Sequence, residues 1–280
     1  MKIMTIIIKK SITYTILSIV IFLYSSNLSA KTSDDFPYKL SAPYDIMLGG
    51  TALSLLGISE YFRERKSLPS RSEVNDLDKK DINAFDRSAT NNYSKDASRV
   101  SDILLYTSIL SPVLIYTASL EGSEYWLIML MYCEAFFINL GLTLTVKAIV
   151  SRERPYMYND SISIDKKMEN RENSVRSFYS GHTSRAFCAA MFLSKVYSDL
   201  HPKSNCRYLV WGLSFSVAIT TGYLRYAAGK HFLTDILAGA ITGSLIGYFV
   251  PELHKRGRYS NISLNPIINE MKGASVSLFF

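Results

Sequence analysis

The chain has 280 residues, of which 48% are hydrophobic and 20% charged, and it carries a formal net charge of +7. A chain of this length can bury a sizeable core, and one large domain is the simplest organisation. The positive charge suits an anionic lipid surface or a phosphorylated substrate. Nucleic acid is disfavoured as a partner, because the sequence has no zinc-finger spacing, RNA-recognition signature or basic heptad helix. Three widely spaced cysteines predict neither a disulfide framework nor a metal site.

The first thirty residues have the layout of a secretory signal peptide. Lys2, Lys9 and Lys10 precede an apolar run, which is followed by small residues up to Ala30. An uncleaved signal anchor is the alternative interpretation. We expect a signal peptide or anchor in residues 1–30, an N-terminal helix and polar loop in 31–99, a helical core in 100–250 and a tail in 251–280.

Six apolar segments with helical character follow. They cover residues 44–62, 100–120, 125–150, 184–200, 207–229 and 231–250. The first is short and interrupted by glycines, and the charged stretch after it, residues 63–99, is typical of a solvated surface connection. The segment 125–150 is the most apolar. It and the last two segments are long enough to span a bilayer, which takes about 20 mostly apolar residues. The end of the tail alternates like a strand, and we assign it no function.

Gly239, Gly243 and Gly247 follow one another at four-residue steps in the last segment. Small residues at this spacing let helices approach closely within a membrane. Because four residues advance about 400° around a helix, His231 and Asp235 lie on the same side as these glycines. We therefore expect this face to pack into the helical bundle.

A histidine, a carboxylate and an arginine flank the start of that last segment. His231 and Asp235 are four residues apart, so on a helix the carboxylate can hold one imidazole nitrogen and leave the other free to react. Arg225 precedes a small Ala-Ala-Gly turn, from which its guanidinium could bind an oxyanion. These three residues indicate a phosphate site, although alone they could equally be a structural helix contact.

Two further groups of polar residues lie at the ends of other segments. Ser180, Gly181 and His182 lie at the start of the fourth segment, and backbone N–H groups at a helix start bind anions. Lys147 ends the third segment, and Arg154 follows seven residues later. Each group has a structural alternative, since the lysine could anchor a membrane helix at the interface and the Ser-Gly-His could be an ordinary turn and N-cap.

The order of these residues along the chain predicts that they meet. Lys147 ends the third segment and His182 opens the fourth, while Arg225 ends the fifth and His231 opens the sixth. If consecutive segments run antiparallel, all four residues lie on the same side of the bundle. This convergence is the strongest internal indication of a site.

In chain order the sequence contains K-x6-R-P, S-G-H and R-x5-H-x3-D. This combination is highly specific, and over residues 100–250 it resembles the type 2 phosphatidic acid phosphatase family, whose fold is shared with vanadium-dependent haloperoxidases. Tyr179 stands where the family usually has proline before S-G-H, and Leu224 where it usually has serine before the arginine. Neither departure replaces a catalytic group. The matching residues are Lys147, Arg154, Pro155, Ser180, Gly181, His182, Arg225, His231 and Asp235.

The resemblance implies an all-α fold, a membrane helical bundle of about five to six helices with a haloperoxidase-like catalytic core. It also implies phosphate monoester hydrolysis without a metal or other cofactor. His231 would be the nucleophile that forms a phosphohistidine, Asp235 would fix its tautomer, and His182 would be the general acid. The phosphate-binding residues would be Lys147, Arg154, Ser180, Gly181 and Arg225.

Several neighbouring polar residues have no counterpart in these motifs. Ser151, Arg152 and Phe178 are adjacent to the motifs but unmatched, and we expect no role for them. His201 and His254 fall in loops on the opposite side, where we expect polar surface.

The sequence therefore predicts a multi-pass membrane lipid phosphatase whose substrate is a lipid phosphate. Phosphatidic acid, phosphatidylglycerol phosphate, an isoprenyl pyrophosphate and lipid A are candidate substrates. We expect a bacterial-type cell membrane. With a cleaved signal and six full spans, the catalytic side would face the cytoplasm; if the short first segment does not cross, it faces the periplasm. We favour the periplasmic side, because it places the basic residues of the other loops in the cytoplasm. The alternatives are a soluble secreted acid phosphatase, a vanadate-dependent haloperoxidase and a non-enzymatic membrane binding protein.

Overall fold

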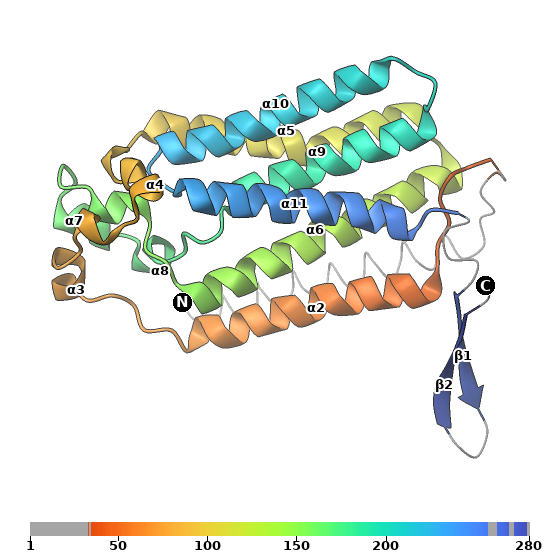
Figure 1. The fold of residues 1–280 in the computed structure, drawn as a ribbon, viewed down its shortest axis with the longest axis horizontal. Helices are drawn as coiled ribbons and strands as arrows, with labels where there is room; N and C mark the ends of the chain where they lie inside the picture. The colour runs from red at the N-terminus through yellow and green to blue at the C-terminus, as the bar shows by residue number, and fades with distance from the viewer. Residues whose placement is uncertain (1–32, 34, 257–261, 269–271, 279–280) are drawn as a thin grey trace.

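Long helices run side by side along the length of the molecule, and short helices gather at one end of the bundle (Figure 1). This computed structural model describes Ser33, residues 35–256 and the strands at 262–268 and 272–278, so the predicted signal lies outside the described residues. The long helices are α2 (Ala42–Glu64), α5 (Lys95–Ser119), α6 (Gly122–Val150), α9 (Gly181–Leu200), α10 (Cys206–Ala227) and α11 (Leu233–Leu253). The short ones are α3 (Arg71–Asn75), α4 (Ala84–Arg87), α7 (Ile164–Met168), α8 (Arg171–Ser174) and the 3₁₀ turns η1 (Lys79–Asp81), η2 (Ser88–Asn91) and η3 (Pro155–Tyr158).

The described core is an all-α bundle, as expected, and α9 lies at its centre. This helix packs against α5, α6, α10 and α11. Its buried positions are mostly small, among them Ala186, Ala189 and Ala190, and small side chains let several helices approach one axis. Large side chains such as Tyr116, Met131 and Phe192 fill the space between the helices further along. The N-terminus of α9 is thereby fixed in the middle of one end of the bundle.

Three helices in the described part of the chain are long and apolar enough to cross a membrane. They are α5, α6 together with the turn that follows it, and α11. We also expected residues 207–229 to be able to span, but α10 does not reach the same apolar character although it has 22 residues. The bundle thus combines strongly apolar helices with more polar ones that contact them.

The contact between α9 and α11 confirms the role expected for the glycines. A Cβ atom on Gly243 would lie 2.0 Å from the Ser184 carbonyl oxygen, and one on Gly247 would lie 2.4 Å from that of Cys188. One turn earlier, a Cβ on Gly239 would lie 2.7 Å from the Ser180 carbonyl oxygen. The backbones therefore touch over two turns, which fixes the register of the two helix starts.

Gly243→Ala is expected to destabilise the protein by about 1–3 kcal/mol or more, because a methyl group must push α11 away from α9. The matched control is Gly212→Ala in α10, where an added Cβ meets nothing within 4 Å. There the gain in helix propensity should stabilise the protein by roughly 0.5–1 kcal/mol. Thermal unfolding of the two detergent-purified variants measures the difference, and equal midpoints would contradict the close packing.

Residues 63–99 do more than the solvated connection we expected. Their short helices α3 and α4 and the turns η1 and η2 lie at the end of the bundle where α11 begins (Figure 1). Asp86 in α4 is fully buried, because it pairs with groups on two other segments. At the C-terminus, β1 (Ile262–Ile268) pairs with β2 (Lys272–Leu278) in an antiparallel hairpin, so the end of the tail contains a strand.

Candidate active site

The predicted site residues all lie at one end of the bundle. Helices α6 and α10 end there with Lys147 and Arg225 in their last turns, and α9 and α11 begin there (Figure 1). Ser180 caps α9, and its backbone N–H donates to the Asp235 carbonyl oxygen over 3.0 Å. The structure therefore brings together the helix ends that the sequence order predicted to converge.

His231 is buried, with 1% of its surface exposed, in the loop before α11. The helix begins at Leu233. Our assumption that His231 lies on this helix is therefore wrong. Its Nδ1 lies 3.6 Å from Oδ2 of Asp235, which is longer than a hydrogen bond. Burial lowers the pKa of His231 well below its usual value, and the charges of Lys147, Arg154 and Arg225 lower it further. The imidazole is therefore neutral and can act as a nucleophile.

Asp235 is held by groups other than His231. Its carboxylate accepts hydrogen bonds from the Ser177 hydroxyl at 2.5 Å, the Arg152 guanidinium at 2.7 Å and the Phe232 backbone N–H at 2.9 Å. Arg152 also pairs with Asp86 at 2.8 Å and lies over the Phe232 ring. Our expectation that Arg152 has no role at the site is wrong, because this side chain bridges two fully buried carboxylates.

Asp86 connects the polar loop to the start of α11. It accepts hydrogen bonds from the backbone N–H of Thr234 at 2.9 Å and from its hydroxyl at 2.6 Å, besides the pair with Arg152. Burial by itself would raise the pKa of Asp86, but the hydrogen bonds from Arg152, Thr234 and Asn83 outweigh it and hold the pKa below the usual value. Asp86 is therefore ionised at neutral pH and fixes the position of Arg152.

His182 has a carboxylate partner that the sequence did not reveal. Its Nε2 is 2.7 Å from Oδ1 of Asp102 in α5, and an Arg225 nitrogen lies 3.6 Å from the same oxygen. Burial, followed by the positive charges of Arg225 and Arg185, lowers the pKa of His182 well below its usual value. Asp102 lies in the apolar segment 100–120, outside every motif, so no local signal marked it.

Three buried cations surround the two histidines. Lys147 donates to the Arg176 carbonyl oxygen at 2.6 Å, and Arg154 donates to the carbonyl and side-chain oxygens of Asn173 at 2.7 and 2.8 Å. Nε of Arg225 is buried and has no hydrogen-bond partner among the described residues. Since Lys147 and Arg154 are held by neutral oxygens, their charges remain uncompensated there, which favours the binding of an anion.

The loop next to the site adds a fourth cation. Lys230 lies beside His231 and over the Tyr156 ring. Burial and the neighbouring charges of Arg154 and Arg225 lower the pKa of Lys230 to about 8. An arriving oxyanion would favour its charged form.

The remaining motif residues shape the helix start. The Ser180 hydroxyl accepts the backbone N–H of Thr183 at 3.3 Å, as an N-cap does. At Gly181 an added Cβ would lie 3.0 Å from Thr143 and 3.7 Å from the end of the Lys147 side chain. Glycine therefore lets that lysine pass close to the α9 N-terminus. The site thus combines several cations, a helix N-terminus and two imidazoles. This arrangement is suited to binding an oxyanion and reacting with it.

Comparison with known proteins agrees with this geometry. Residues 126–259 match the PAP2 superfamily, and this range includes every motif residue named above. The Porphyromonas gingivalis protein called lipid A 4'-phosphatase is 29% identical over 143 residues, which are 46% of this chain and 57% of that protein. A Dictyostelium discoideum PA-phosphatase related-family protein is 33% identical over 123 residues, 42% of this chain and 45% of that protein. The chain thus spans about half the length of these curated relatives.

One solved structure is also similar. It is the transmembrane PAP2 type phosphatidylglycerolphosphate phosphatase from Bacillus subtilis, with 20% identity and a TM-score of 0.46 over 76% of this chain and 100% of that one. The residues that match the PAP2 superfamily include the central helix α9 and the helix α11 packed on it.

Proposed function

We propose that the chain is a membrane lipid phosphatase that hydrolyses a phosphate monoester or pyrophosphate of a lipid through a phosphohistidine on His231. The observation that carries this proposal is the meeting of two imidazoles, each beside a carboxylate, with three buried cations at one end of a bundle. Three helices long and apolar enough to cross a membrane support a substrate that resides in the bilayer.

In the first step the neutral imidazole of His231 attacks phosphorus. Nδ1 faces Asp235, so Nε2 is the nitrogen that forms the P–N bond while the bond to the lipid oxygen breaks. His182 takes up a proton when the phosphate binds, because the charge of the phosphate offsets the cations that lower the pKa of this histidine, and it donates that proton to the departing oxygen. The new imidazolium is attracted to Asp235, and the present gap of 3.6 Å is of the kind that tightens when the reacting complex forms.

In the second step a water molecule attacks phosphorus and the P–N bond breaks. His182 accepts the proton of that water, which restores both histidines and releases inorganic phosphate. Lys147, Arg154 and Arg225, with the Ser180 hydroxyl and the Gly181 N–H, would hold the phosphoryl oxygens through both steps. Because these groups supply the positive charge that the transition state requires, we propose that no metal ion takes part.

Asp102→Asn is expected to lower kcat by about 100-fold, because the Asp102 carboxylate orients His182 and favours its protonated form. Without the negative charge of Asp102, the pKa of His182 in the enzyme–substrate complex should fall. The alkaline limb of the kcat profile, where the proton on His182 is lost, should therefore move to lower pH. An unchanged limb together with a lower kcat would instead assign Asp102 a purely structural role.

A lipid panel tests the proposed function. Detergent-purified protein is given phosphatidic acid, phosphatidylglycerol phosphate, an isoprenyl pyrophosphate, lipid A and a water-soluble monoester, and released phosphate is measured. The name of the P. gingivalis relative makes lipid A an informative member of this panel. We expect faster release from at least one lipid than from the soluble ester. No release from any member would contradict the proposal, and vanadate-dependent bromination would favour a haloperoxidase instead.

Extraction and labelling test the membrane assignment. We propose that the site faces the extracytoplasmic side of a bacterial-type membrane. The protein should then resist extraction by salt, unlike a soluble secreted phosphatase. A cysteine introduced into the stretch of residues 63–99, which lies at the site end of the bundle, should react with an impermeant thiol reagent on intact cells.

A further inference from the structure

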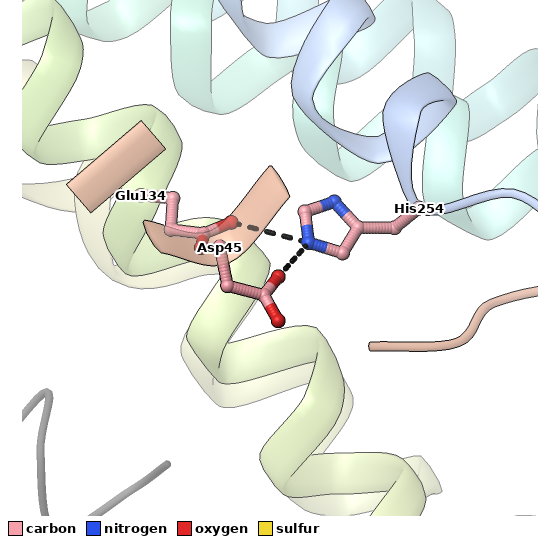
Figure 2. Close-up of side chains that lie close together, drawn as sticks. All are labelled: Asp45, Glu134 and His254. Carbon is pink, nitrogen blue, oxygen red and sulfur yellow. Dashed lines mark hydrogen bonds and ion pairs between the residues drawn. The ribbon is translucent and has the colours of Figure 1, made fainter. Parts of the chain in front are cut away.

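A second group of ionisable side chains meets at the end of the bundle opposite the candidate active site. Asp45 comes from the first turn of α2, Glu134 from α6, and His254 directly follows α11 (Figure 2). The exposed fractions of these residues are 6%, 6% and 1%. Our expectation that His254 is polar surface is wrong, because the imidazole turns into the space between α2 and α6.

The hydrogen bonds of His254 direct one nitrogen toward the two carboxylates. Nδ1 lies 2.9 Å from the Val250 carbonyl oxygen and donates its proton there. Nε2 then faces Oδ1 of Asp45 at 2.8 Å and Oε2 of Glu134 at 3.4 Å (Figure 2). The three ligand atoms lie within 4.8 Å of one another. Three electron-pair donors therefore point into one small space.

A single proton cannot satisfy this arrangement. If Nε2 is protonated, it can donate to Asp45, but Oε2 of Glu134 still has no hydrogen-bond partner among the described residues. A buried carboxylate oxygen without a donor is costly. The unpartnered oxygen points at the same spot as the imidazole nitrogen, so a cation between them would satisfy all three groups.

We propose that Asp45, Glu134 and His254 bind a first-row divalent cation of the Zn²⁺ or Mn²⁺ type. Nitrogen and carboxylate ligands lie about 2.0–2.2 Å from Zn²⁺, so neighbouring ligands of a tetrahedral ion are about 3.3–3.5 Å apart. The 3.4 Å separation of Nε2 and the Glu134 oxygen fits that spacing, and the 2.8 Å separation from Asp45 needs a small carboxylate rotation.

The surroundings of the cluster suit such an ion. Metal-binding histidines usually donate their other N–H to a backbone carbonyl, as His254 does to Val250. The imidazole ligand favours Zn²⁺ over Mg²⁺ and Ca²⁺, which prefer oxygen, and the two carboxylates also suit Mn²⁺. The ion would join α2, α6 and the end of α11. This inference does not depend on the proposed phosphatase function, because the two groups occupy opposite ends of the bundle.

Metal content tests the site directly. The full-length protein is purified in detergent, stripped with a chelator, incubated with Zn²⁺ or Mn²⁺, desalted and analysed by mass spectrometry for bound metal. We expect about one ion per chain, and at least about 10-fold weaker binding in Glu134→Gln and in Asp45→Asn. His201→Ala is the matched control, since it removes an exposed histidine near the same end and should bind as the wild type does.

Thermal unfolding separates a metal site from a proton-bridged contact. Zn²⁺ should raise the unfolding midpoint of the stripped wild type by several degrees and leave that of Glu134→Gln unchanged. Two outcomes overturn the proposal: a folded, stripped wild type that takes up no stoichiometric metal, or a Glu134→Gln protein that binds as much as the wild type. Phosphate release is not a readout here, so the result is independent of the lipid panel.

Discussion

His231→Gln is expected to reduce phosphate release from the preferred lipid by at least about 10⁴-fold, because the variant lacks the atom that forms the P–N bond. The imidazole is buried beside Asp235 and three cations, whereas the other imidazole of the site, His182, pairs with Asp102. Glutamine keeps a similar size and should leave the bundle folded. Phosphate release under saturating lipid, measured beside thermal unfolding, separates lost chemistry from lost structure.

Two further measurements sharpen this expectation. His201→Gln changes an exposed histidine away from the site and should retain wild-type turnover. Rapid quenching of the wild type with ³²P-labelled substrate should trap an acid-labile, base-stable phosphoprotein, which His231→Gln should lack. A folded His231→Gln protein that turns over at a rate near that of the wild type would exclude His231 as the nucleophile.

Arg152→Met is expected to destabilise the protein by about 3–5 kcal/mol, because it leaves Asp86 and Asp235 buried without their shared cation. Methionine fills similar space against the Phe232 ring, so the loss reports charge rather than packing. Turnover should fall as well, since Asp235 loses one of the groups that hold it. Unfolding in detergent by heat or denaturant measures the stability, and phosphate release measures the activity.

The pH dependence of this loss identifies its cause. In the wild type, the hydrogen bond from Arg152 helps to hold the pKa of Asp86 below its usual value; in the variant this pKa must rise. As the pH falls, Asp86 becomes protonated and needs no cation, so the gap between variant and wild type should shrink. Arg99→Met removes an exposed pair with Asp96 and should change stability by less than about 0.5 kcal/mol. A loss equally large at every pH would point to packing instead.

The sequence correctly predicted that the motif residues converge at one end of the bundle. Lys147, His182, Arg225 and His231 converge, because the ends of successive antiparallel helices must share one side of a bundle. The glycine steps in the last segment likewise predicted a close helix contact, and the backbone approach at Gly243 bears this out. These features are local or follow from chain order, so they can be read without coordinates.

What the sequence could not predict depends on pairs far apart in the chain. Asp102 meets His182 across 80 residues, and Arg152 meets Asp235 across 83. No spacing rule connects such positions. Arg152 and the motif residue Arg154 are both arginines, and only their contacts in the structure show that their roles differ. His254 looked like surface because it follows the last apolar segment, yet α2 and α6 cover it. Only the packing of the helices reveals these contacts.

Helix α11 joins the two ionisable groups of this protein, and its length has a further consequence. Its 21 residues extend over about 31 Å, close to the hydrocarbon thickness of a bilayer of about 30 Å. Where α11 crosses a membrane, His231 and His254 therefore lie at opposite membrane surfaces, and each is next to a different aqueous compartment. In sealed proteoliposomes of one orientation, a lower pH in the lumen alone, or in the bulk solution alone, should affect the protonation of only one of these two histidines.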